Sequence, residues 1–263
     1  IYTNIGSLRN EGVEFSISSK PIVTNKFIWD LGFNIAYNSN KITKLNKSND
    51  ADYYIPVGGI SGGTGNTVQA HKVGYPAFSY LLYEQVYDKD GNPIEGLYVD
   101  RNGDGVIDEA DKRLYKSRDP KVVMSFTSRM EYKNFDFGFS LRANLGNYVY
   151  DNVQSNNSSY SAIYNSAGYL NNLISRGTKF QNPQYMSDYY LHNAGFLRCD
   201  NITLGYTWNE LAQNKLKLRL YGAVQNPFVI TKYKGLDPEV FSGIDNNVYP
   251  RPVTFLLGVI ITY

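Results

Sequence analysis

The sequence predicts an all-β fold in which the chain forms the C-terminal part of a larger antiparallel transmembrane β-barrel. Three observations predict this class: apolar and polar residues alternate, short turns alternate with long polar connections, and aromatic residues gather near predicted strand ends. A mean hydropathy of -0.39 and the lack of any run of about 18 apolar residues exclude transmembrane helices. Barrel strands pass this test because their lipid-facing and lumen-facing residues average to a polar sequence.

Alternation defines the strands. Between residues 27 and 38 the odd positions carry Phe, Trp, Leu, Phe, Ile and Tyr, whereas Asp30, Asn34 and Asn38 share the even positions. One face of such a strand requires lipid or a core, and the other requires water. The same pattern assigns Phe137 and Leu257 to lipid-facing positions. About nine strands are expected, over residues 9–20, 26–39, 63–72, 76–87, 121–132, 135–149, 195–208, 216–229 and 253–263.

The connections between these strands alternate in length. Short turns are expected at residues 23–25, 73–75, 133–134 and 209–215, and long polar segments at 40–62, 88–120, 150–194 and 230–252. Short periplasmic turns and long external loops are typical of outer-membrane barrels. In a compact soluble domain, such long loops would count against the strand assignment.

Aromatic residues occupy positions where a barrel meets the membrane interface, because an amphipathic ring keeps its polar tip among the headgroups. The residues expected there are Trp29, Tyr37, Tyr132, Tyr148, Tyr150, Tyr206, Trp208 and Tyr263. About nine strands do not close into a bacterial barrel of even strand number, so further strands and a plug are expected outside this sequence.

Composition argues against two other classes of protein. The formal net charge is only +2 and the basic residues are scattered, so nucleic-acid binding is not expected. Cys199 is the only cysteine, which excludes an internal disulfide and predicts a buried or lipid-facing thiol. His71 and His192 are expected to be structural, and no nucleophile motif accompanies them. The sequence therefore does not predict an enzyme.

One polar segment has the spacing of a calcium loop. Residues 100–111 place side-chain oxygens at the first, third and fifth positions, Gly105 at the sixth and an apolar residue at the eighth. The ligands expected for Ca²⁺ or Mg²⁺ are Asp100, Asn102, Asp104, the Val106 carbonyl, Asp108 and Asp111. The alternative is a metal-free loop of Asx turns, because the twelfth position carries a short aspartate and no helices flank the loop.

Residues that contact a ligand are expected in the loops and at the positions that the alternation assigns to the barrel lumen. The alternation along the predicted strands is the only basis for this choice, and it selects Tyr80, Arg142, Asn144 and Tyr221. The stretch 148–190 is rich in Tyr and Asn, which stack on and hydrogen-bond to sugars or peptides. An ordered loop without ligand contact is the alternative for that stretch.

Several segments together resemble the SusC/RagA family of TonB-dependent outer-membrane transporters. Residues 226–228, Asn-Pro-Phe, followed by residues 231–239 form the most specific similarity. Pro227 and the terminal Tyr263 depart from the aliphatic residue and the Phe that are usual in the family. The other similar segments are residues 4–14, 29–45, 98–112, 195–206 and 249–255.

The resemblance implies a 22-stranded barrel with an N-terminal plug, which imports nutrient oligomers, glycans or oligopeptides, in the cell outer membrane of a Gram-negative bacterium of the Bacteroidota type. It further implies energy from the TonB complex, acting through the plug, and a SusD-like surface lipoprotein as a lid. Residues 1–263 would then be a C-terminal portion of the barrel, without the plug.

Two soluble alternatives are a secreted all-β carbohydrate-binding module with a calcium loop and a β-rich glycoside hydrolase. A soluble sandwich would pack its apolar face on a second sheet, whereas a barrel wall leaves that face to lipid. The surroundings of the apolar face therefore decide between them.

Overall fold

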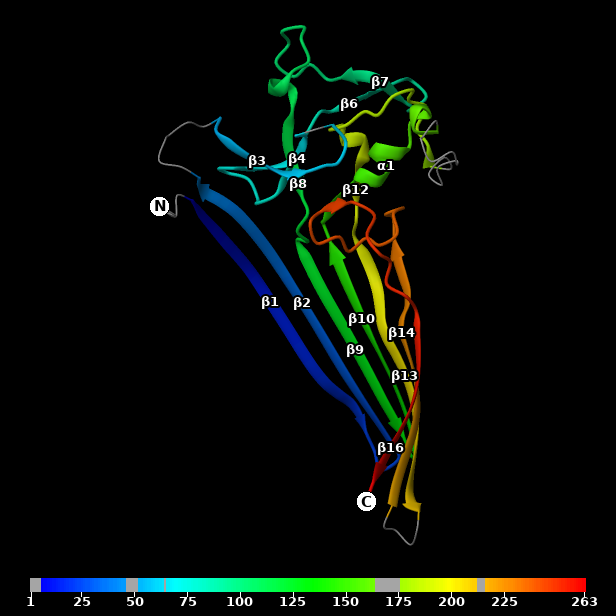
Figure 1. Ribbon diagram of the computed structural model, residues 1–263. Coiled ribbons are helices and arrows are strands. Elements are labelled where there is room, and N and C mark those ends of the chain that lie inside the picture. Colours follow the sequence, from blue (N-terminus) through cyan, green and yellow to red (C-terminus); the bar gives the residue numbers. More distant parts are fainter. Residues whose placement is uncertain (1–5, 46–51, 64, 164–175, 212–215) are drawn as a thin grey trace, which may run out of the picture.

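The main element of the computed structural model is one antiparallel sheet of seven strands, which we call the wall. The structure describes residues 6–45, 52–63, 65–163, 176–211 and 216–263. Figure 1 shows the wall as a tall panel with the long loops gathered at its upper end. In spatial order the strands are β1 (Ser7–Val23), β2 (Phe27–Lys44), β9 (Val122–Tyr132), β10 (Phe135–Leu145), β13 (Phe196–Leu211), β14 (Leu216–Thr231) and β16 (Thr254–Thr262). The predicted all-β antiparallel class is confirmed.

The strand register gives the wall two chemically different faces. One row of directly paired residues is apolar and crosses the whole sheet: Ile22, Trp29, Met130, Phe137, Leu204, Gly222 and Leu257. A row on the opposite face is polar: Ser16, Asn34, Ser125, Arg142 and Arg198. Because side chains alternate between faces, a register that aligns these rows gathers most of the apolar positions on one side. The predicted alternation is confirmed, and Phe137 and Leu257 share one row.

No second sheet within the described residues covers the apolar face. Leu257 is 80% exposed and Phe255 is 78% exposed. A continuous apolar surface of this kind is unfavourable in water and suits lipid. The two-sheet carbohydrate-binding module is therefore incompatible with the fold, since its apolar face would be covered.

Aromatic side chains mark the lower end of the apolar face. Phe27, Tyr132, Phe135 and Tyr206 pair directly across four neighbouring strands. The ring centroids of Phe135 and Tyr206 lie 4.7 Å apart, and the Trp208 ring lies 4.6 Å from that of Tyr206. The prediction for Tyr148 and Tyr150 is wrong, because both belong to β11 (Tyr148–Asp151), outside the wall.

Short turns lie at one end of the wall and long loops at the other (Figure 1). Residues 24–26 and 133–134 join strands at the lower end, whereas segments 45–121, 146–195 and 232–253 join them at the upper end. Residues 212–215 of the predicted turn 209–215 lie outside the described residues. Predicted strand 135–149 ends early, because Gly146 has a positive φ of 84° and turns the chain out of the sheet.

The predicted wall strands 63–72 and 76–87 are a misassignment. The structure places shorter strands there, β4 (Thr67–Lys72), β5 (Ser79–Leu82) and β6 (Gln85–Tyr87), inside the first long loop. β4 and β5 belong to a separate sheet with β3 (Tyr54–Gly59) and β8 (Arg113–Ser117), in the order β3-β4-β5-β8. The predicted turn 73–75, the loop 88–120 and residues 45–62 of the predicted loop 40–62 are consequently parts of one connection, whereas residues 40–44 extend β2.

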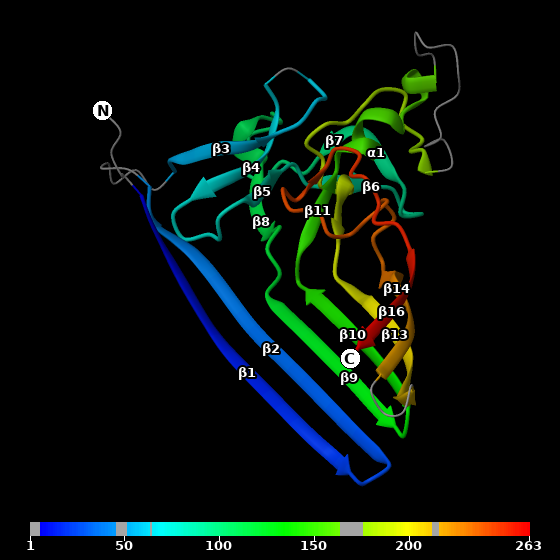
Figure 2. The same ribbon diagram turned by 60° about the horizontal axis from the view of Figure 1, so that its bottom comes forward.

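The three long loops pack together into what we call the loop assembly, above the wall (Figure 2). Its buried apolar core is Ile60, Val68, Tyr80, Leu82, Tyr150, Phe180, Tyr190 and Ile244. None of the helices in the described ranges combines the length and apolarity that a membrane crossing requires. The remaining elements are β7 (Pro93–Tyr98), η1 (Glu109–Asp111), α1 (Asn152–Asn157), η2 (Tyr160–Ile163), η4 (Asp188–Tyr190), β12 (Leu191–Asn193) and β15 (Ile244–Asp245).

Candidate functional site

The polar face of the wall holds a hollow of about 900 Å³, lined by residues of all seven strands. Charged side chains at its margin are already paired. Lys20 Nζ lies 3.1 Å from Asp30 Oδ1, and Arg219 Nη2 lies 2.6 Å from Asp136 Oδ1. Serine, threonine and asparagine side chains supply most of the remaining polar lining. Such a surface offers many hydrogen-bonding groups and few unpaired charges.

Two glycines on this face let large side chains lie flat on the sheet. Arg219 donates from Nε and Nη2 to both carboxylate oxygens of Asp136, reaching across β13 directly over Gly205. A Cβ on Gly205 would collide with this ion pair, so the pair could keep this arrangement only with glycine at position 205. The Arg219 guanidinium also lies 4.7 Å from the centroid of the Tyr221 ring, and that ring covers Gly258 on β16.

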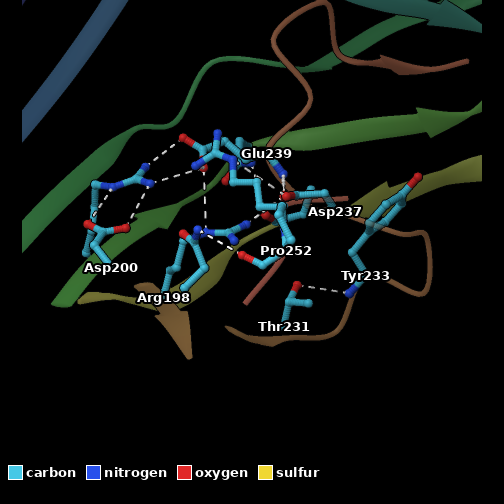
Figure 3. A network of polar contacts seen from close by, with 12 residues as sticks. Arg198, Asp200, Thr231, Tyr233, Asp237, Glu239 and Pro252 are labelled. Atoms are coloured by element: carbon cyan, nitrogen blue, oxygen red, sulfur yellow. Dashed lines mark hydrogen bonds and ion pairs between the residues drawn. The ribbon is translucent and has the colours of Figure 1, made fainter. Parts of the chain in front are cut away.

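A group of six charged residues closes the upper end of the polar face, and we call it the mouth cluster. Its members are Arg142, Arg198, Asp200, Asp237, Glu239 and Arg251. Arg142 Nη1 donates to Glu239 at 2.6 Å, and Arg198 Nη2 donates to Asp237 at 2.7 Å (Figure 3). The side chains of Arg198 and Asp237 are each only 4% exposed.

Charge is balanced in the mouth cluster, which holds three arginines and three carboxylates. Burial raises the pKa of Glu239, but the guanidinium groups of Arg142, Arg251 and Arg198 lower it more, so the carboxyl pKa lies below its usual value. The cluster joins the wall strands β10 and β13 to segment 232–253. It therefore fixes this loop on the wall and leaves no uncompensated charge among its members.

An irregularity in β13 brings Asp200 into the mouth cluster. In the pairing of β13 with β10, Leu141 pairs with Cys199 and Ser140 with Asn201, so Asp200 is an extra residue. This β-bulge lets Asp200 reach the polar face, where it accepts hydrogen bonds from Arg142.

The neighbouring strand β14 is irregular at the same level. Asn226 has a positive φ of 50°, and its amide donates to the carbonyl of Pro252 at 3.3 Å. Residues 226–228, which carry part of the family resemblance, thus coincide with a local departure of β14 from regular strand geometry.

Sequence reasoning found one member of the mouth cluster, Arg142, and missed the other five. The polar run 198–201 interrupts the alternation of an otherwise regular strand, and this interruption is the signal that was available. Asp237 and Glu239 lie in a loop, so no periodicity applied to them. Their partners Arg198 and Arg142 are distant in sequence and are brought close only by the fold.

The four predicted substrate contacts do not form one site. Arg142, Asn144 and Tyr221 lie on the polar face, as parity predicted. Asn144 is partly exposed and lies two residues nearer the loops than Arg142. Tyr221 belongs to the Arg219 arrangement lower on the wall.

Tyr80 is misplaced by the parity argument. It has no exposed surface and lies in the core of the loop assembly. Its hydroxyl lies 2.8 Å from the carbonyl oxygen of Tyr148 and 2.7 Å from that of Gly243, and burial raises its pKa. The role of Tyr80 is structural, because four consecutive residues, Ser79–Leu82, are buried and alternation has no meaning there.

The loop at residues 100–111 folds as a closed turn. Asp100 accepts hydrogen bonds from the backbone N–H groups of Gly103 and Gly105, and Asp104 accepts one from Val106. Asn102 Oδ1 accepts from Asp104 N, and Asp108 Oδ1 accepts from Ala110 N. These are the Asx turns that the sequence left as the metal-free alternative.

The two ends of this loop are tied together by its last aspartate. Asp111 is fully buried and accepts from the backbone N–H groups of Arg101 and Asp108 at 2.7 and 2.9 Å. These donors lower its pKa. The described residues contain no group of three or more His, Cys, Asp or Glu side chains placed to hold a metal ion.

The remaining predicted positions have structural surroundings. Cys199 is buried, one of its two expected environments. The ring centroid of His71 lies 4.6 Å from that of Phe78, and burial lowers the pKa of His71. In stretch 148–190, residues 164–175 lie outside the described residues, while Tyr150 and Tyr190 are core residues with no exposed surface.

Known proteins with similar sequences are TonB-dependent receptors. No family model matches the sequence. The chain is 55% identical to the TonB-dependent receptor SusC of Bacteroides thetaiotaomicron, over 97% of this chain and 26% of the receptor. It is 28% identical to the TonB-dependent receptor P3 of Formosa agariphila, over 97% of this chain and 29% of that receptor. The chain thus spans under a third of the length of these curated relatives.

Solved structures with the same fold include those of the RagAB peptide transporter. One superposes with a TM-score of 0.77 at 23% identity, covering 98% of this chain and 30% of that chain. The RagAB peptide importer in its "open-open" state gives a TM-score of 0.75 at 21% identity. The relatives are transporters and receptors, which agrees with the prediction that the chain is not an enzyme. Similar in sequence across nearly its whole length and similar in fold, the chain belongs to the SusC/RagA family of TonB-dependent outer-membrane transporters.

Proposed function

We propose that the chain forms wall strands and external loops of an outer-membrane importer of nutrient oligomers, either glycans or oligopeptides. The single observation that carries this proposal is the two-faced wall, whose apolar face suits lipid and whose opposite face carries a polar hollow and paired charges. A surface with many hydrogen-bonding groups and few unpaired charges lets a polar oligomer bind weakly and leave again.

The proposed importer works with two partners, the TonB complex and a surface lipoprotein. A plug outside the present sequence would connect the barrel to the TonB complex, and a SusD-like lipoprotein would cover the loop assembly from outside. The names of the relatives support dependence on TonB, and the RagAB structures support a two-protein transporter. The packed loop assembly at one end of the wall offers a firm surface for such a lid.

Uptake by cells tests the proposal. Strains that contain or lack the full-length receptor would be given fluorescent oligosaccharides and fluorescent oligopeptides, and accumulated label would be measured. Accumulation of one probe class should disappear in the strain without the receptor, and also in a strain without TonB. If neither probe class depends on the receptor, the import proposal is wrong.

Calcium in loop 100–111 is a second, separate proposal. It is supported by the ligand spacing and by the closure of the loop through Asp111 and the backbone of Arg101. Calcium should protect the loop of the full-length protein from proteolysis, and Asp104→Ala should abolish this protection. Asn92→Ala, in the β6–β7 turn outside the motif, serves as control. Equal protection of the Asp104 variant would rule out the proposed ligands.

A further inference from the structure

A pocket of about 400 Å³ lies in the loop assembly, apart from the wall hollow and the mouth cluster. We call it the basic pocket. It is lined by Gln154, Arg176, Gly177, Tyr189, His192, Lys232 and Lys234. Two of the three long loops contribute, because Lys232 and Lys234 follow β14 whereas the other residues belong to segment 146–195. The pocket is large enough for a ligand group much bigger than a water molecule.

The lysines are held in place by the residue between them. Tyr233 is buried, and its hydroxyl lies 2.7 Å from Asp245 Oδ2. Lys232 and Lys234 are exposed on either side of it, so all three residues alternate between core and pocket. Anchoring of the tyrosine therefore keeps both lysine residues at the same pocket.

The basic pocket has a net positive charge. Arg176 forms an ion pair with Asp151, which is fully buried, so that guanidinium is neutralised. Among the described residues, no carboxylate oxygen lies within 4.0 Å of the Nζ of Lys232 or Lys234. The two lysines thus bring charge to the pocket without an acidic partner.

Neutral polar groups line the rest of the pocket. The Nε2 atom of His192 lies 3.3 Å from Gln154 Oε1, and Gln154 Nε2 donates to the Arg176 carbonyl at 2.9 Å. Burial lowers the pKa of His192, and the cations Arg176 and Lys234 lower it too, against the opposing effect of Asp151. The imidazole of His192, the amide of Gln154 and the phenol ring of Tyr189 thus line the pocket beside the two lysines.

We propose that the basic pocket binds an anionic group, a carboxylate or a sulfate, of a ligand that reaches the external loops. The inference rests on the proposed import function and narrows its substrate class to oligomers that carry negative charge. Two lysine side chains that line the same pocket attract an anion more strongly than either would alone. Acidic sugars and the C-terminus of a peptide both present such a group.

Equilibrium binding to the purified full-length receptor tests the proposal. Calorimetric titrations would use trigalacturonate against neutral galactotriose, and trialanine against trialanine amide. The charged member of at least one pair should bind the wild-type protein about tenfold or more tightly than its neutral counterpart. Preference for trigalacturonate identifies an acidic glycan as the source of the anion, and preference for trialanine identifies a peptide terminus.

Variants assign the charge preference to the pocket. Lys232→Ala with Lys234→Ala should lose about tenfold or more in affinity for the charged probe. Lys232→Arg with Lys234→Arg should retain binding, which separates loss of charge from loss of folding. Lys89→Ala with Lys179→Ala removes the same charge from exposed positions outside the pocket and should bind normally.

Three results would overturn the proposal. The charged and neutral probes could bind wild type equally well, or the Lys232→Ala, Lys234→Ala variant could bind the charged probe as tightly as wild type. The third is a loss of affinity in the Lys89→Ala, Lys179→Ala control as large as that in the pocket variant. A negative result leaves the uptake test of the import function standing, because uptake measures translocation in cells whereas the titrations measure charge recognition by the isolated receptor.

Discussion

The wall and the loop assembly use the same residue types under opposite conditions. Tyr132 is 51% exposed on the apolar face of the wall, whereas Tyr80, Tyr150 and Tyr190 have no exposed surface within the loops. The wall is one sheet thick and relies on lipid to cover its apolar face. The loop assembly meets water and buries a core of its own. A residue type alone therefore does not reveal its environment, and the surrounding pattern does.

The mouth cluster lies where the two regions meet, so breaking it should have the largest effect. Asp237→Ala would leave Arg198 buried without its main partner, at a cost of roughly 3–5 kcal/mol. Hydrogen exchange in the full-length protein should then increase across segment 232–253. Glu131→Ala removes an ion pair with Arg129 that is exposed to solvent, and should change exchange little. Unchanged exchange in the Asp237 variant would show that the cluster does not hold the loop.

A charge on the apolar face tests the wall itself. Leu257→Arg should cost roughly 2–4 kcal/mol at a bilayer-midplane position and reduce the folded receptor in the membrane fraction. Phe137→Arg, on the same face but only two residues from Phe135 at the lower end of the wall, should have a smaller effect. Leu256→Arg is the matched control, because the neighbouring side chain faces the polar side. Normal folding of the Leu257 variant, judged by heat-dependent gel mobility, would contradict the assignment of the faces.

A smaller change tests whether the loop core is independent of the wall. Tyr80→Phe removes the hydroxyl that contacts the carbonyls of Tyr148 and Gly243, at a cost of about 1–3 kcal/mol. Proteolysis of the loops should become faster while heat-dependent mobility of the barrel stays the same. Tyr249→Phe, at an exposed position, should change neither. A simultaneous loss of barrel stability would mean that the two regions unfold as one unit.

The smallest expected effect is a pH dependence confined to the loops. Burial lowers the pKa of His192 below the value of about 6.5 in the unfolded chain, so the unfolded state binds the proton more tightly. The contribution of His192 to loop stability is therefore present above about pH 6.5 and decreases as the pH falls. His192→Gln should flatten the dependence of loop proteolysis on pH between about 7 and 5. An unchanged slope would assign that dependence to another group, such as His71.

How much the sequence predicted differs between the regions for a physical reason. A strand between lipid and water must alternate, so the strands near Phe137 and Leu257 were predicted with the correct faces. In the loop assembly, short strands are buried on both sides, and Ser79–Leu82 offers no alternation to read. The bulge at Asp200 and the ion pair between Arg142 and Glu239 depend on contacts between distant segments, which one sequence does not display.

The shared core of the loop assembly has a consequence for the order of folding. It combines Val68 and Tyr80 from the first loop, Tyr150 from the second and Ile244 from the third. Ile244 precedes only the last strand of the wall, so the core stays incomplete until segment 232–253 has joined it. Contacts so distant in sequence form slowly. We therefore expect the external surface to mature last, after the strands that carry it are already paired.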